Sequence, residues 1–322
     1  MPRQPTPLPD ALTTGPFWFR EAIDFGVPRR RLAASDLTHP HRGVYAPAGA
    51  DDQLAACESA LPLLGEDRRF SHLTAARLWG MPLPFEWRSG EPLHVLTLPG
   101  AEPLRRSGIV GWESADRPGG ALVGPFPVVA AADVWAQLSV PGATGRDPET
   151  GRRQTLSRVW LVAVGDYLLT GPRAPGGKRT PLCSRDELVA AAITRRGKRG
   201  AKALTWALER VRAGAQSPRE SMLRLALVDR GLPEPAVQPP IATSAGIRHP
   251  DLGYLEERVL IEYQGDHHRT DPAQWREDLR RQQFFEDAGY RVIAVTIEEF
   301  ADDCFALALR IRRALRGRSY GA

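Results

Sequence analysis

The sequence predicts a mixed α/β protein, α+β overall, built from two or three domains. Its 322 residues exceed the length of a typical single domain, about 100–150 residues. Hydrophobic residues make up 42% of the chain and charged residues 25%, as in ordinary folded proteins. Runs with helical spacing alternate with short β-branched runs, for example at 93–98 and 259–261, so we expect both helices and strands.

The composition also restricts the compartment and the class of partner. No run approaches the ~18 consecutive apolar residues of a membrane span, and residues 1–10 lack the apolar core of a signal peptide. Cys57, Cys183 and Cys304 are isolated and lack metal-binding spacing, which is typical of reduced thiols in a cytoplasmic protein. A net charge of +5 and a pI near 9.4 are compatible with nucleic-acid binding.

A hairpin is expected inside the stretch 249–278. The apolar run 259–261 is typical of a buried strand, and the polar residues just before it are typical of a turn. A hairpin that closes between residues 256 and 257 places Asp251 directly opposite Glu262. Facing residues have Cβ atoms about 4.5–5.5 Å apart, and two carboxylates at that range repel by roughly 4 kcal/mol at an effective dielectric constant near 20. A divalent cation would turn this repulsion into coordination, because hard cations take carboxylate oxygens.

The same register places Gly253 opposite Leu260. The alternation of side chains along a strand places Glu262 and Gln264 on one face and Tyr263 on the other. Further polar side chains follow the strand: Asp266, His267 and His268. The alternative is a solvated sheet edge that ends in a polar loop. Against it, a strand with this apolar run is more often buried, and a buried carboxylate needs a partner.

The order Asp251, ten residues, Glu262-x-Gln264-Gly265 and then a histidine pair resembles the PD-(D/E)XK nuclease superfamily. Within it, the pattern is most similar to the branch of very-short-patch-repair endonucleases. The resemblance covers roughly residues 217–315. It implies a restriction-endonuclease-like domain, in which helices flank a mixed sheet.

The resemblance also implies a metal site. In that family the Asp and the Glu of the hairpin bind Mg²⁺, so Asp251, Glu262 and the carbonyl of Tyr263 are the implied ligands of Mg²⁺ or Mn²⁺. An acidic residue on the preceding helix assists the family's site, and Glu220 is the matching residue. The capping box formed by Ser217 and Glu220 would account for Glu220 without a catalytic role, so both interpretations stay open.

The implied chemistry departs from the family at one position. The family's Lys is replaced by Gln264, and the chain has lysines only at 178, 198 and 202. Gln264 cannot take a proton and could only orient a water, so His267 or His268 is the expected group for proton transfer. Arg281, on the next helix, is expected either to approach the scissile phosphate, as the family implies, or to form only a surface salt bridge with Asp278.

After a disordered tail at 1–15, residues 16–82 are expected to form a winged-helix-like DNA-binding domain. We expect helices at 17–24 and 28–35 and a strand at 43–45. This pattern resembles the N-terminal domain of AbiEi-type antitoxins, which are DNA-binding repressors. The alternative is a small helical cap with a solvated basic face.

Four arginines are the expected DNA contacts of this domain: Arg29, Arg30, Arg31 and Arg42. Arg29, Arg30 and Arg31 crowd the first turn of the second expected helix, where positive charge opposes the helix dipole. Contact with phosphates would explain their position. Arg42 lies in the expected wing.

Residues 83–215 are expected to form a middle α+β region in which we identify no catalytic pattern, and residues 216–322 the endonuclease-like domain. The function predicted from the sequence is a metal-dependent DNA endonuclease with a DNA-binding N-terminal domain, in defence or repair, acting on double-stranded DNA. The alternative is a non-catalytic DNA-binding regulator, or a type IV antitoxin-like protein, whose nuclease fold has lost catalysis. The target sequence, the choice between DNA and RNA, the oligomeric state and any toxin or operon partner stay open.

Overall fold

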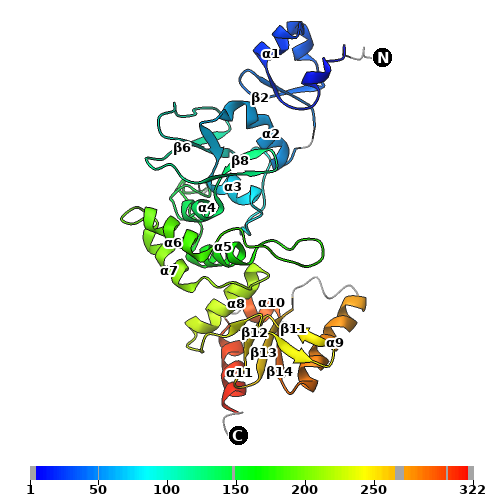
Figure 1. Cartoon of the computed structure of the whole chain (residues 1–322), viewed down its shortest axis with the longest axis vertical. Coiled ribbons are helices and arrows are strands. Elements are labelled where there is room, and N and C mark those ends of the chain that lie inside the picture. The colour runs from blue at the N-terminus through cyan, green and yellow to red at the C-terminus, as the bar shows by residue number, and fades with distance from the viewer. Residues whose placement is uncertain (1–4, 50, 147–148, 265–271, 302–303, 318–322) are drawn as a thin grey trace. The chain divides into compact units, whose positions relative to one another are not determined.

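Figure 1 shows the computed structural model of the chain, which describes residues 5–49, 51–146, 149–264, 272–301 and 304–317. The chain divides into two compact units, Met1–Leu156 and Ser157–Ala322. Each unit combines helices with a sheet that has parallel and antiparallel strand pairs, so the predicted α+β class is confirmed. Among the helices of the described ranges, none has the length and apolar character needed to cross a membrane.

The first unit begins with a small sheet and short helices. Its elements are η1 (Asp10–Leu12), β1 (Phe17–Trp18), α1 (Phe19–Asp24), η2 (Arg29–Ala33), β2 (Leu37–His41) and β3 (Val44–Pro47). The strands pair antiparallel in the order β1-β3-β2, and η1, α1 and η2 contribute buried apolar side chains to the core against them. The helix expected at 17–24 begins two residues later, because Phe17 pairs with Tyr45 in the sheet.

The second expected helix, at 28–35, is a short 3₁₀ segment. Ala34 adopts an extended conformation, with φ −73° and ψ 151°, which ends η2. The chain then brings Asp36 back to Arg31, whose guanidinium donates two hydrogen bonds, of 2.9 and 2.6 Å, to that carboxylate. Residues 16–48, all of them described, thus contain one α-helix rather than the two of a helix–turn–helix.

The rest of the first unit is built on a five-stranded sheet. Its elements are α2 (Gln53–Leu64), β4 (Arg68–Phe70), α3 (His72–Leu78), β5 (Leu93–Thr97), β6 (Ile109–Glu113), β7 (Gly120–Val123), β8 (Phe126–Val129) and α4 (Ala131–Gln137). The strand order is β6-β5-β4-β8-β7. Because β4 pairs with β5, the expected domain boundary between residues 82 and 83 divides one sheet and is corrected.

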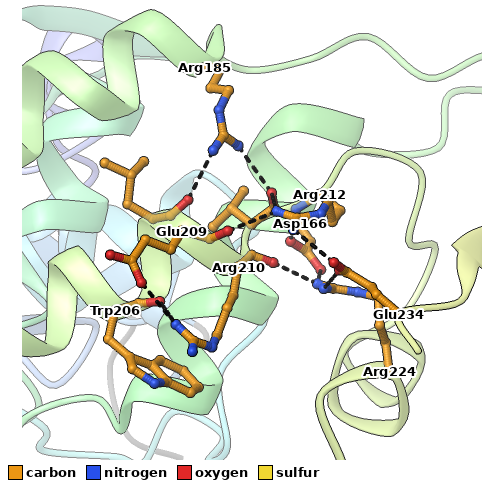
Figure 2. A network of polar contacts seen from close by, with 10 residues as sticks. Asp166, Arg185, Trp206, Glu209, Arg210, Arg212, Arg224 and Glu234 are labelled. Atoms are coloured by element: carbon orange, nitrogen blue, oxygen red, sulfur yellow. Dashed lines mark hydrogen bonds and ion pairs between the residues drawn. The ribbon is translucent and has the colours of Figure 1, made fainter. Parts of the chain in front are cut away.

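The second unit begins with α5 (Arg158–Thr170), α6 (Arg185–Thr194) and α7 (Ala201–Arg210), followed by α8 (Pro218–Asp229). A buried ion pair joins α5 to α8: Arg224 Nη2 lies 2.9 Å from Asp166 Oδ2, and the two side chains are 1% and 0% exposed. Figure 2 shows Arg224 also reaching Glu234, at 2.7 Å, and Asp166 accepting the backbone N–H of Arg212, at 2.6 Å. The expected boundary between residues 215 and 216 would cut through this network, so it is also corrected.

The remaining elements form the C-terminal sheet and its helices: β9 (Ala236–Val237), β10 (Ile241–Thr243), β11 (Gly246–Arg248), β12 (Leu252–Tyr254), β13 (Val259–Tyr263), α9 (Pro272–Asp287), β14 (Arg291–Val295), α10 (Ile297–Ala301) and α11 (Phe305–Arg316). The sheet order is β14-β13-β12-β9, with β13 and β14 parallel and β12 antiparallel to both its neighbours. β10 and β11 form a separate hairpin.

Helices cover both faces of this sheet, with α11 and α9 on opposite sides in Figure 1. Val259 and Ile261 of β13 belong to the apolar core shared with α8 and α11. Leu260, between them, packs instead against Phe285 of α9. Because strand side chains alternate, Glu262 points to the same face as Leu260, which is the side of α9.

Candidate functional site

The hairpin of β12 and β13 has the predicted register. Gly253 lies opposite Leu260. Just before β12 begins, Asp251 accepts a 2.8 Å hydrogen bond at Oδ2 from the backbone N–H of Tyr263. The hairpin therefore holds the carboxyl group of Asp251 at the end of β13, beside Glu262.

A polar cavity of about 230 Å³ opens at this end of the sheet. Glu262 and Gln264, predicted to share a face of the strand, both line it. Among the described residues that line the cavity, Arg281 is the only cationic one. The other polar residues of the lining are Gln216, Gln238, Asp251, Tyr263 and Gln282.

A third carboxyl group, that of Glu220, comes from the first turn of α8 and is 5% exposed. Ser217 Oγ accepts the backbone N–H of Glu220 at 3.3 Å, so Ser217 caps α8 as predicted. The carboxylate of Glu220 accepts the Ser217 hydroxyl, at 3.0 Å to Oε1, rather than the Ser217 backbone N–H of the predicted capping box. Oε2 accepts the N–H of Gln216 at 2.9 Å and the side-chain amide of Gln238 at 3.1 Å. The same amide nitrogen donates to Asp251 Oδ1 at 3.3 Å, so it links the carboxyl groups of α8 and the hairpin.

Gln238 is a site residue that the sequence pattern does not reveal. It precedes two prolines and has a φ of 47°, an uncommon left-handed conformation for a residue with a Cβ. Its backbone N–H donates to the carbonyl of Asp251 at 3.0 Å, and its own carbonyl lies 2.9 Å from Nδ1 of His249. A glutamine in a proline-rich segment carries no chemical signature, and only the folded chain brings it between two carboxyl groups.

Arg281 of α9 forms an ion pair with Glu262. Its Nε lies 3.2 Å from Oε2, and its Nη2 lies 3.2 Å from Oε1, so one guanidinium engages both oxygens. Nη2 also donates to the carbonyl of His249. The side chain of Asp278, the alternative partner expected for Arg281, lies outside the described residues.

The three carboxyl groups are held in an environment that disfavours their charged forms. Burial raises the pKa of Glu220 and of Glu262 to about 7 each, and repulsion from Asp251 adds to both shifts. Burial also raises the pKa of Asp251, against the lowering effects of the Tyr263 N–H and of Arg281. A bound cation would favour the charged forms, because an opposite charge offsets both desolvation and mutual repulsion.

The donor set suits a hard divalent cation. Mg²⁺ typically binds through one or two carboxylates and keeps several waters, and Asp251 and Glu262 line a cavity large enough for waters. Within the described ranges, no three His, Cys, Asp or Glu side chains are grouped so that they could hold a metal ion as they stand. Both oxygens of Glu262 are bonded to Arg281 in this arrangement.

Of the other residues predicted for this site, the structure describes Gln264 but not the histidine pair. Gln264 is exposed, lines the cavity and donates its backbone N–H to the carbonyl of Val295 at 2.8 Å. The histidines expected to transfer a proton, His267 and His268, lie outside the described residues. The three lysines of the chain all precede α8, so none belongs to the C-terminal sheet.

Three of the four arginines predicted to bind DNA are exposed: Arg29, Arg30 and Arg42. Arg31 differs, because its side chain is 7% exposed and its guanidinium is bonded to Asp36 and to the carbonyl of Thr6. The expectation that Arg31 contacts phosphate is therefore corrected. Its charge is used inside the fold, where it ties the N-terminal segment and Asp36 to η2.

The fold and the site define a two-unit α+β protein with a carboxyl cluster at the end of a mixed sheet. In the comparisons with known proteins, the chain is 28% identical over 250 residues to the uncharacterized proteins MT2308 and Rv2248 of Mycobacterium tuberculosis, strains CDC 1551 / Oshkosh and ATCC 25618 / H37Rv. The alignment covers 77% of this chain and 82% of each relative. No protein-family model and no solved structure matches the chain.

Proposed function

We propose that the protein is a metal-dependent DNA endonuclease whose active site is the cavity at the end of β13. The observation that carries the proposal is a set of three carboxyl groups whose pKa values are raised mainly by burial. Asp251 and Glu262 line the cavity, and Glu220 is linked to Asp251 through the side-chain amide of Gln238. Buried carboxyl groups with raised pKa values destabilise the fold when they are charged, and they are typical of functional sites rather than of structural ones. The resemblance of the hairpin to PD-(D/E)XK nucleases supports the same assignment.

In this proposal the side chains have separate tasks. Asp251 and Glu262 would hold Mg²⁺ or Mn²⁺. Glu220 supports Asp251 indirectly, because the side-chain amide of Gln238 donates hydrogen bonds to both carboxyl groups. When bound, the cation activates a water and neutralises charge at the phosphodiester. Gln264 orients a water without taking its proton, since an amide has no titrating group near neutral pH.

Double-stranded DNA is the proposed substrate because exposed arginines occur in both units. Arg29, Arg30 and Arg42 are exposed on the first unit. Arg281 borders the cavity of the second unit and is 36% exposed. Arginine is well suited to phosphate because its planar group can donate two parallel hydrogen bonds.

Two observations favour the second candidate function, a DNA-binding regulator without catalysis. The family's Lys is absent at Gln264, and Arg281 engages both oxygens of Glu262. A protein that uses a nuclease fold only to bind DNA would keep its basic residues and could lose the catalytic lysine.

A plasmid-nicking assay with Mg²⁺ or Mn²⁺ tests the proposal. We expect wild type to nick supercoiled plasmid or a mismatched duplex, and Asp251→Asn and Glu262→Gln to lower the rate by at least about 10²-fold. Glu256→Gln, at an exposed position in the turn of the same hairpin, is the matched control and should retain full activity. If wild type is inert with both metals but binds duplex DNA tightly, the regulator is the better description.

A further inference from the structure

The ion pair between Arg281 and Glu262 joins two elements at the cavity. Arg281 comes from α9 and Glu262 from β13, and the two contacts between them are both 3.2 Å. The carboxylate is 21% exposed and the guanidinium 36% exposed, so water and ligands can reach both groups. The pair is thus a contact within the proposed active site rather than part of the apolar core.

The pair has the geometry of a two-pronged contact. Nε and Nη2 of one guanidinium face the two oxygens of one carboxylate, and Nη2 also donates to the carbonyl of His249. The guanidinium carbon lies 5.7 Å from the ring centre of Phe285, one helical turn further along α9. A phosphate group offers two oxygens at similar spacing, so it can replace Glu262 as a partner of the same fork.

We propose that Arg281 keeps the cation site closed in the free protein and opens it by exchanging Glu262 for a DNA phosphate. This inference rests on the proposed function and adds its regulation: DNA and the divalent cation bind cooperatively. The exchange leaves no charge unpaired, since Arg281 gains the phosphate while Glu262 gains the cation. A cation in the absence of DNA must instead bind beside a guanidinium, which repels it and occupies both oxygens of one ligand.

The first arm of the test measures cation affinity without DNA. Mn²⁺ is titrated calorimetrically into the chelator-treated full chain, as wild type, Arg281→Ala and Arg280→Ala. Arg280 is the matched control because it precedes Arg281 on α9, is exposed and carries the same charge. We expect Arg281→Ala to bind Mn²⁺ about tenfold more tightly, or better, and Arg280→Ala to stay within about twofold of wild type, since only the charge at the site repels the ion strongly.

The second arm measures the coupling between DNA and cation. Fluorescence anisotropy gives the affinity of a labelled mixed-sequence duplex with and without Ca²⁺, a hard cation with the same preference for oxygen ligands. We expect Ca²⁺ to tighten DNA binding by wild type and by Arg280→Ala. In Arg281→Ala the gain should be about tenfold smaller, because the site is already open.

Arg281→Gln is made beside Arg281→Ala so that poor folding of one variant does not end the test. Thermal unfolding confirms which variants are folded before either titration is read. Arg281→Gln also removes the guanidinium and its charge but keeps a polar side chain, so it should likewise tighten Mn²⁺ binding.

Two results would overturn the inference, and they differ. If wild type binds Mn²⁺ through Asp251, as judged by loss in Asp251→Asn, but Arg281→Ala and Arg281→Gln bind no more tightly than Arg280→Ala, the closed site is refuted and the proposed function stands. If no variant shows binding that depends on Asp251, both the inference and the metal-dependent function fail.

Discussion

Raising the pH from 4.5 to 7 should lower the stability of the second unit in metal-free solution. The pKa of Glu220 is raised from its ordinary value of 4.5 to about 7, mainly by burial, so the folded chain holds the proton more tightly than the unfolded chain does. A raised pKa contributes stability that is complete below pH 4.5 and is lost as the pH rises through about 7. Glu262 has the same shift for the same first cause and contributes in the same direction.

The size of the effect follows from the pKa shift. Each pKa unit corresponds to about 1.4 kcal/mol, so a rise from 4.5 to about 7 represents about 3 kcal/mol of unfolding free energy for Glu220. Glu262 adds less than the same amount again, because both shifts include repulsion from Asp251. A loss of about 3 kcal/mol is a large fraction of the stability of a typical domain, which is about 5–15 kcal/mol.

The variant Glu220→Gln isolates this contribution. Its amide oxygen can take the place of Oε2, which accepts hydrogen bonds from Gln216 and Gln238, and its NH₂ can donate to Ser217 Oγ. Glu220→Gln is thus a permanent equivalent of the protonated form. We expect its unfolding free energy to fall by about 3 kcal/mol less than that of wild type over the same pH range.

The assay is urea unfolding of the full chain in EDTA, followed by limited proteolysis with mass identification so that the two units are scored separately. Glu256→Gln, at an exposed position in the hairpin turn, controls for the loss of one carboxyl group. Parallel pH profiles for wild type and Glu220→Gln would refute the reasoning. Such a result would mean that Glu220 titrates near its ordinary pKa in the folded protein.

Three further predictions concern other parts of the molecule. Arg224→Ala should cost about 3–5 kcal/mol in urea unfolding of the second unit, since it leaves Asp166 buried and unpaired, and a cost below about 1 kcal/mol would contradict this. The double variant Arg29→Ala, Arg30→Ala should weaken duplex binding and reduce the slope of log affinity against log salt concentration by an amount that corresponds to up to about two phosphate contacts. An unchanged slope would mean that these arginines are only solvated. Gln264→Lys should preserve or raise nicking, because it supplies the residue that PD-(D/E)XK nucleases usually have at the matching position, and inactivity of this variant in an otherwise active protein would count against that role.

The parts of the site that the sequence predicted are those that depend on local pattern. The register of Gly253 with Leu260 follows from a short turn between two strands, and it brings Asp251 to Tyr263 without information from elsewhere in the chain. The cap formed by Ser217 and Glu220 is local in the same sense.

The expectations that were wrong or incomplete concern residues whose partners lie elsewhere in the chain, where a local pattern does not identify them. The sequence pattern suggested that Arg31 could contact a phosphate, but in the folded chain its guanidinium forms an ion pair with Asp36. Gln238 reaches two carboxyl groups only because its backbone adopts a left-handed turn before Pro239. The expected boundary at 215/216 failed because it separates Asp166 from Arg224, which lie 58 positions apart in the chain.

That last ion pair bears on how the protein could be divided or recombined. A fragment starting at residue 216 would retain every carboxyl group of the cavity yet lose Asp166, and the guanidinium of Arg224, 1% exposed, would lose its buried counter-ion. Glu220 lies one turn before Arg224 on the same helix, and Gln238 links it to Asp251 of the cavity, so loss of the ion pair would also disturb this link. A fragment meant to fold with an intact cavity should therefore include helices α5, α6 and α7. The division between the two units, at Leu156 and Ser157, is the recombination point that keeps these helices with the C-terminal sheet.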